Sequence, residues 1–310
     1  MLSFQGLHGQ VQSLCNDDNS TTLTLLKNFI NQTQSNLLAR RKDITEKSAT
    51  EDTVASQQAY ELPYDYGKMF HLTVTVGSIA YPVLPIEDDQ TWLDRNARSS
   101  SFTSDIPQFY YIFNDQVYLY PTPTSSSNTI TMYYHKRVKA MTFDNYTTGT
   151  VDIITNGATA VTGSGTTWTA PMIGRFLSVT PSATATADGD GIWYEIDTRT
   201  SDTVIGLKRN YQGTSLTTGA SASYIIGEMP TIPEPYHELL IWRPVALYYQ
   251  QKGQFDKSKI FWELYKDMEK QFINDRSSKV ESAIISGDMV RMKQRIHGQD
   301  PNKFPLNLTS

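Results

Sequence analysis

Residues 233–253 read PEPYHELLIWRPVALYYQQKG, and this stretch determines the architecture that we expect for the chain. Pro235 suits a first helical turn, and apolar residues recur at helical spacing from Leu239 onward. Pro244 lies inside the pattern and predicts a kink, because proline removes one helical hydrogen bond. Gly253 is placed to end the helix. The predicted helix therefore carries an apolar stripe, and no segment close to it in the sequence can cover that stripe.

Two further segments have the same character. Residues 20–48 predict a helix that Asn19 can cap, with one apolar face formed by Leu23, Leu26, Ile30, Leu37 and Leu38. A helix after Gly253 is indicated by Ile260, Phe261, Leu264, Met268 and Phe272. Such stripes need a partner, since isolated amphipathic helices are marginal in water. We therefore expect the helices of the two chain ends to pack together.

The middle of the chain has strand character instead. Residues 108–113 and 117–120 predict a hairpin in which Asn114 and Asp115 supply the turn. Further along, residues 146–228 contain short apolar runs at regular spacing, separated by glycines. Regularly spaced short strands are typical of small barrels and sandwiches.

These patterns predict an α+β fold, with a helical bundle formed from both chain ends and two inserted, mainly antiparallel β-units. The helical domain is expected at residues 1–56 and 229–287, and the first β-unit at 57–145. The second β-unit, at 146–228, is expected to be a small barrel or sandwich, and residues 288–310 an extended C-terminal arm.

Neither composition nor motifs indicate an enzyme. The five histidines are scattered, and none has a second ligand at metal-binding spacing. Asp188 and Asp190 resemble the start of a calcium loop, but Ile192 and Arg199 stand where oxygen ligands are needed. The single cysteine, Cys15, excludes an intrachain disulfide and a cysteine-cluster metal site. We therefore expect no catalytic residue, no metal site and no cofactor.

Two basic runs raise the alternative of a nucleic-acid contact: residues 40–42 near the end of the first helix, and residues 135–139 after a tyrosine-rich strand. Cations are favoured at a helix C-terminus, and alternate strand residues face opposite ways. We therefore interpret both runs as solvated surface. The net charge of −5 also argues against a nucleic-acid coat.

The apolar runs are far shorter than the ~20 residues of a membrane span, so no membrane contact is expected.

Tyrosine is the more informative residue type. The chain has 18 tyrosines and 12 phenylalanines, and many of the tyrosines fall in the β-regions. Tyrosine is enriched at protein interfaces, because its ring is apolar and its hydroxyl can hydrogen-bond. The sequence therefore favours a structural protein over a catalyst.

Several short blocks, in order and spacing, resemble the head-to-tail adaptor proteins of tailed bacteriophages. In the C-terminal half the blocks are Gly227–Pro230, Ile232–Leu240 and Tyr248–Gly253. Upstream they are Phe29–Asn31, Leu62–Lys68, Ile106–Pro107, Tyr110–Tyr111, Tyr118–Pro123 and Ile130–Tyr134. About half the chain takes part. Residues 146–228 depart from the pattern, because smaller adaptors lack this module, and the resemblance gives it no role.

The resemblance implies a structural virion protein, assembled in the host cytoplasm and placed at the head–tail junction. Such adaptors form a ring, usually of twelve copies, beneath the portal protein, and the other face of the ring receives a tail nozzle, tube or other tail protein. The ring lines the channel through which genomic DNA leaves. A net charge of −5 suits DNA passage without specific binding.

The C-terminal segment of such adaptors commonly reaches into the portal. Here the matching segment runs from about Ser277 to Ser310 and carries a discontinuous apolar and basic series. The expected portal-binding residues are Val280, Ile284, Ile285, Met289, Val290, Arg291, Met292, Lys293, Arg295 and Ile296.

The alternative is a virion protein that binds a receptor or a carbohydrate. In that case the tryptophans of the β-units, Trp92, Trp168 and Trp193, would stack on sugar rings.

Overall fold

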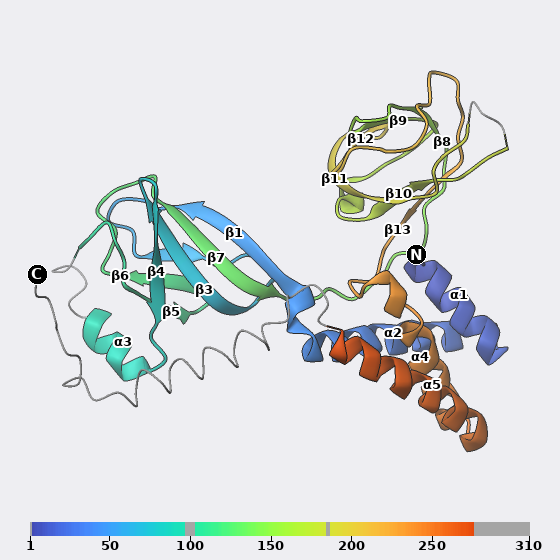
Figure 1. Cartoon of the computed structure of the whole chain (residues 1–310), viewed down its shortest axis with the longest axis horizontal. Helices are drawn as coiled ribbons and strands as arrows, with labels where there is room; N and C mark the ends of the chain where they lie inside the picture. Colours follow the sequence, from blue (N-terminus) through green and yellow to red (C-terminus); the bar gives the residue numbers. More distant parts are fainter. Residues whose placement is uncertain (1, 97–102, 184–186, 276–310) are drawn as a thin grey trace, which may run out of the picture. The chain divides into compact units, whose positions relative to one another are not determined.

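The computed structural model of the chain describes residues 2–96, 103–183 and 187–275 (Figure 1). These residues form helices and two β-sheets, so the fold is α+β, as expected. The chain divides into two compact units after Tyr265. The α-helices are α1 (Phe4–Cys15), α2 (Ser20–Arg40), α3 (Asp89–Asn96), α4 (Leu239–Gln251) and α5 (Phe255–Asn274).

Side chains cap the two N-terminal helices. The hydroxyl of Ser3 accepts from the backbone N–H of Gly6 at 3.2 Å, and the amide oxygen of Asn19 accepts from that of Thr21 at 2.8 Å. The cap at Asn19 confirms the expectation from sequence. Helix α1 was not expected, because Gly6 and Gly9 dilute its pattern. Its buried face nevertheless has helical spacing: Phe4, Leu7, His8, Val11 and Cys15.

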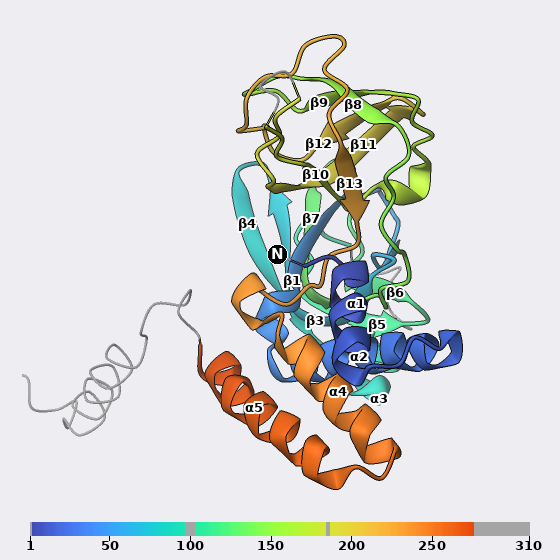
Figure 2. The same cartoon turned by 90° about the vertical axis from the view of Figure 1, so that its right-hand side faces the viewer.

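Helix α4 contacts both N-terminal helices, and α1, α2 and α4 lie side by side (Figure 2). The hydroxyl of Tyr248 donates to Asp17 at 2.8 Å, and that of Tyr249 donates to the carbonyl of Leu14 at 2.9 Å. Pro244 lies inside α4, and Gly253 has a φ of +73° just after its end, the left-handed conformation expected of a helix-ending glycine.

The first sheet has seven strands in the order β1-β7-β3-β4-β5-β6-β2, antiparallel except for the β4–β5 pair. Asn114 and Asp115 both have positive φ between β5 and β6, which confirms the expected hairpin. A buried core that includes Leu72, Val117 and Tyr134 fills one face of the sheet. The strands are β1 (Glu46–Asp52), β2 (Ala59–Glu61), β3 (Tyr66–Val76), β4 (Ile79–Pro85), β5 (Phe109–Phe113), β6 (Gln116–Tyr120) and β7 (Thr129–Lys136).

Strand β1 corrects the expectation that the first helix runs over residues 20–48. Helix α2 ends at Arg40, a 3₁₀ turn, η1 (Lys42–Thr45), follows, and the chain then pairs with β7 in continuous register from Glu46 to Asp52. Arg41 bonds to Asp43 in this turn at 2.8 Å. Strand pairing with a distant segment thus overrides the weak helical pattern of these residues.

A second unexpected element, α3, covers part of the first sheet. Trp92 is buried and stacks on Tyr111 at 5.0 Å between ring centroids. Arg95 lies over the ring of Phe109 at 4.3 Å. The eight-residue helix has only one buried residue, so its sequence offered little periodicity to detect.

The second sheet has the order β13-β10-β11-β12-β9-β8. Strand β8 forms bridges to the segment that precedes β13, Val151 to Ala222 and Ile154 to Leu216. The sheet therefore curls around one core (Figure 1). Trp168 lies fully buried in this core. Strand β9 is short and contains Gly163, so its own sequence has little strand character. The strands are β8 (Thr150–Ile154), β9 (Ala160–Ser164), β10 (Phe176–Val179), β11 (Trp193–Ser201), β12 (Val204–Leu207) and β13 (Tyr224–Gly227).

Candidate functional site: a polar junction at the β-linkers

Two connecting segments meet the N-terminal helices: residues 137–149, which run from β7 to β8, and residues 228–233, which follow β13. Tyr146 and Ile226 exchange two backbone hydrogen bonds of 2.8 and 2.9 Å, which ties the entry of the second sheet to its exit. The N–H of Phe4, at the start of α1, donates to the carbonyl of Glu228 at 2.8 Å. We call the contacts of these segments with α1 and α2 the junction.

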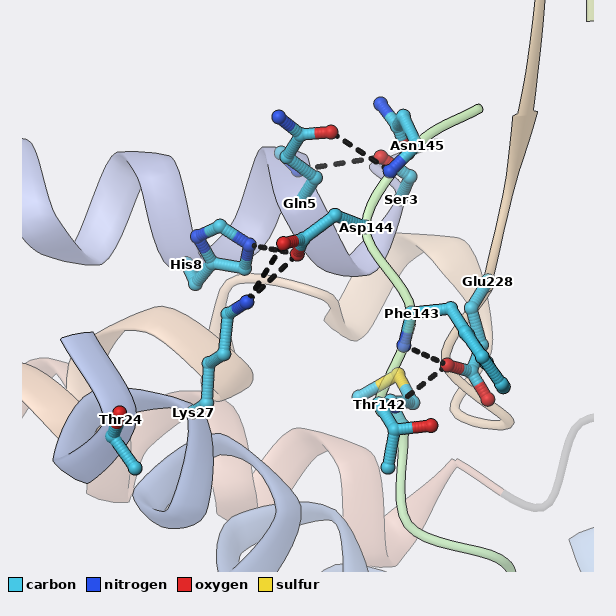
Figure 3. Close-up of polar contacts among 12 residues, drawn as sticks. Ser3, Gln5, His8, Thr24, Lys27, Thr142, Phe143, Asp144, Asn145 and Glu228 are labelled. Carbon is cyan, nitrogen blue, oxygen red and sulfur yellow. Dashed lines mark hydrogen bonds and ion pairs between the residues drawn. The ribbon is translucent and has the colours of Figure 1, made fainter. Parts of the chain in front are cut away.

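An ionic cluster forms one part of the junction (Figure 3). Asp144 accepts from Lys27 of α2 at 2.8 Å and from Nε2 of His8 of α1 at 2.9 Å. The side chain of His8 is 8% exposed and that of Asp144 is 52% exposed. One carboxylate on the linker therefore binds both helices.

The titration of this cluster follows from its environment. Burial lowers the pKa of His8, and the bond to Asp144 offsets that effect only in part. For Asp144, burial raises the pKa, but hydrogen bonds from Lys27 and His8 outweigh burial and hold the pKa below its usual range. At neutral pH, His8 is therefore an uncharged donor to an ionised carboxylate.

Amide side chains of the helices bind the backbone of both connecting segments. Asn31 pairs with both backbone groups of Met141: its Nδ2 donates to the carbonyl and its Oδ1 accepts from the N–H, both at 2.9 Å. Gln34 accepts from the N–H of Thr231 at 3.0 Å. Gln5 accepts from the N–H of Asn145 at 2.8 Å. A side-chain amide can replace a strand neighbour in this way, because it carries one acceptor and one donor side by side.

Glu228 closes the junction from the exit segment. Its Oε2 accepts from two consecutive N–H groups, those of Thr142 at 2.7 Å and Phe143 at 2.9 Å (Figure 3). The guanidinium of Arg175 lies over the ring of Phe143 at 3.6 Å. The entry and exit segments are therefore bonded to each other as well as to the helices.

Chemically, this arrangement holds backbone in place. The bonded groups are amides, carboxylates, a lysine and the neutral imidazole of His8, and they bind each other or the main chain. Within residues 2–96, 103–183 and 187–275, no cluster of His, Cys, Asp or Glu could hold a metal ion. Over the same residues, no helix is long and apolar enough to cross a membrane.

All ten residues expected to bind the portal, from Val280 to Ile296, lie outside the described residues, as does His297. His237 is buried and donates through Nε2 to the carbonyl of Ile232 at 3.0 Å, which is a structural contact. His71 is exposed on β3. Asp190 accepts from the N–H of Ile192 at 3.0 Å, so it stabilises the turn before β11.

Sequence reasoning missed the junction completely. The histidine–carboxylate pair that it sought locally exists between His8 and Asp144, which are 136 positions apart. The Asn31–Met141 pair spans 110 positions. The one local signal was in α1, where Ser3 can cap a helix and apolar residues recur at helical spacing. That pattern would have placed His8 on a buried helical face.

Comparison with known families adds one match. A family model described as SU10 adaptor protein matches residues 2–158, half of the chain. The matched region holds α1, α2, the first sheet and β8, and with them Lys27, Asn31 and Asp144 of the junction. No curated protein matches the chain.

Proposed function

This chain belongs to the SU10 adaptor protein family, and from that premise we propose that it is a head-to-tail adaptor of a tailed bacteriophage particle. The family match is the observation that carries the proposal. The junction supports it, because a connector must hold its modules together by contacts rather than perform chemistry. On this proposal the protein is a virion component with no catalytic role, assembled in the host cytoplasm.

The helices of both chain ends form one bundle in this proposal. Contacts of α4 with α1 and α2 support it, together with the bonds from Tyr248 and Tyr249 to the end of α1 and the turn after it. Residues 57–145 and 146–228 would then be insertions into the bundle, with β1 added to the first of them.

The bundle would assemble into a ring, with twelve copies as the expected number, between the portal protein and a tail nozzle, tube or other tail protein. Closed rings arise when two different surfaces of one chain meet head to tail. Genomic DNA would pass through the ring without specific binding, in keeping with a net charge of −5.

The C-terminal arm, residues 288–310, with the apolar and basic series from Val280 to Ile296, is the proposed portal-binding element. Many weak arms acting together in a ring would give stable attachment through multivalency.

Receptor or carbohydrate binding, the alternative, has less support. Trp168 and Trp92 are buried, so neither can stack on a sugar ring.

Mass photometry of the purified chain, alone and mixed with its portal protein, tests the proposal. We expect rings of about a dozen copies, or assembly on the portal. A version truncated after Ser286 should keep the thermal midpoint of the full chain but fail to stay on the portal. Trimers that do not bind the portal protein would argue for a receptor-binding protein. Stable attachment of the truncated chain would show that the C-terminal arm is not the portal-binding element.

A further inference from the structure

The two basic runs of the sequence meet at one groove. Residues 40–42 end α2 and begin η1, and residues 135–139 leave β7; Nδ1 of His135 donates to the carbonyl of Lys42 at 2.9 Å, across 93 positions. Gly67 of β3 lets the end of β7 approach closely here, since a Cβ at Gly67 would lie 2.7 Å from the carbonyl oxygen of His135. No local pattern joins these runs, because their pairing depends on the first sheet.

The groove has a volume of about 260 Å³ and a strongly one-sided charge. Five basic residues line it, and no aspartate or glutamate does: Lys42, Lys68, His135, Lys136 and Arg137. Between them lies an apolar floor that includes Leu38, Ala39 and Val138. We call this feature the basic groove.

Its cations are not neutralised by the fold. The side chains of Lys42, Lys68, Lys136 and Arg137 have no ion pair or hydrogen bond with any residue that the structure describes. Two nearby carboxylates bind other residues: Asp43 binds Arg41 at 2.8 Å, and Asp65 accepts from Lys47 at 2.8 Å and from Tyr134 at 2.7 Å. Like charges gathered in this way repel one another, and an arriving anion relieves that repulsion.

The chemistry of the lining selects among anions. No phenylalanine, tyrosine or tryptophan lines the groove, so it lacks the large stacking surfaces that single-stranded nucleic acids use. An apolar floor inside a cationic rim instead fits carboxylate side chains alternating with aliphatic ones.

We propose that the basic groove docks an acidic peptide segment with aliphatic side chains, supplied by a partner protein of the particle. The inference rests on the proposed adaptor function and deepens it by giving one docking surface and the charge of its partner. It is independent of the C-terminal arm and of the ring.

Fluorescence anisotropy on the full chain tests the groove directly. The probe is a labelled twelve-residue peptide of alternating glutamate and leucine, tested beside its glutamine–leucine counterpart and a labelled twelve-nucleotide single strand. We expect the glutamate peptide to bind best, and its affinity to fall as salt rises, because the Debye length drops from ~10 Å at 0.1 M to ~3 Å at 1 M.

The diagnostic variant is Lys68→Glu with Arg137→Glu, two exposed residues of the rim. The matched control is Arg209→Glu with Lys259→Glu, which changes the net charge equally at exposed positions outside the groove. We expect the rim variant to weaken peptide binding by about tenfold or more and the control by less than about twofold, since only rim charges face the ligand. Circular dichroism verifies that both variants are folded.

Three outcomes would overturn the inference: equal weakening in both variants, no difference between the glutamate and glutamine peptides, or rim-dependent binding of the single strand alone. Each leaves the adaptor function standing, because ring formation and portal attachment are measured separately. If the chain forms no ring but still binds the peptide through the rim, the proposed adaptor function fails and the groove proposal stands.

Discussion

The junction and the basic groove both lie where α2, or the turn after it, meets the chain at and beyond the end of β7, yet they differ in charge balance. In the junction, Lys27 meets the carboxylate of Asp144 at 2.8 Å, and every linker contact satisfies a backbone or side-chain group. In the groove, Lys68 and Arg137 have no bonded carboxylate among the described residues. The difference separates charges that hold the fold together from charges that the fold leaves free for a partner.

The largest expected effect is in the junction. Asn31→Ala leaves both the N–H and the carbonyl of the buried Met141 without a partner, and should lower the free energy of unfolding by ~2–4 kcal/mol. Chemical denaturation measures the loss, and hydrogen exchange should quicken over residues 137–146. The control is Asn28→Ala, an exposed position one turn earlier. Equal losses at both positions would show that the Met141 pairing is not structural.

Asp144→Ala should cost less, about 1–2 kcal/mol, because the ion pair that it removes is half exposed. Asp197→Ala, at an exposed position in β11, is the matched control and should stay within ~0.5 kcal/mol of the parent. If the two substitutions cost the same, the cluster around Asp144 contributes nothing specific.

Acidification should weaken the junction in a defined pH range. Burial lowers the pKa of His8 and of His237 below the ordinary value of 6.5. Their contribution to stability is therefore complete above about pH 6.5 and is lost as the pH falls toward their lowered pKa values in the folded chain. In that range the unfolded chain binds protons at these histidines, whereas the folded chain does not. His8→Gln should show a smaller fall in thermal midpoint between pH 7.5 and pH 5.5 than the parent.

His71→Gln is the control for that experiment, because His71 is exposed on β3. It should keep the full pH dependence of the parent. An unchanged pH dependence in His8→Gln would mean that His8 does not control the acid sensitivity of the junction.

The smallest effect is expected in the groove. Lys68→Gln with Arg137→Gln should leave the free energy of unfolding within ~0.5 kcal/mol of the parent, or raise it slightly by removing repulsion. Thermal unfolding at low salt is the sensitive measurement. A clear loss of stability would show that these cations have a structural role, and the contrast with the junction would disappear.

Local patterns in the sequence were sufficient for much of the fold. The capped apolar face of α2, the Asn114–Asp115 hairpin and the glycine after α4 all depend on residues within a few positions of each other. Sequence alone also supported the resemblance to phage adaptors, which the family match confirms.

Strand β1 shows where local reasoning ends. Its sequence, EKSATED, has almost no buried residue, so no alternation marks it as a strand. It exists because β7, some 80 residues later, presents a free edge that it can pair with in continuous register.

The functional surfaces have the same origin. Asp144 meets His8, Asn31 meets Met141, and Lys42 meets His135 only after the chain has closed loops of roughly 90 to 140 residues. Helical and strand periodicities report neighbours two to four positions away and carry no record of such closures. The sequence therefore determined which local elements form and which family the chain resembles, whereas only the tertiary structure decided which charges are neutralised in the junction and which remain free in the groove.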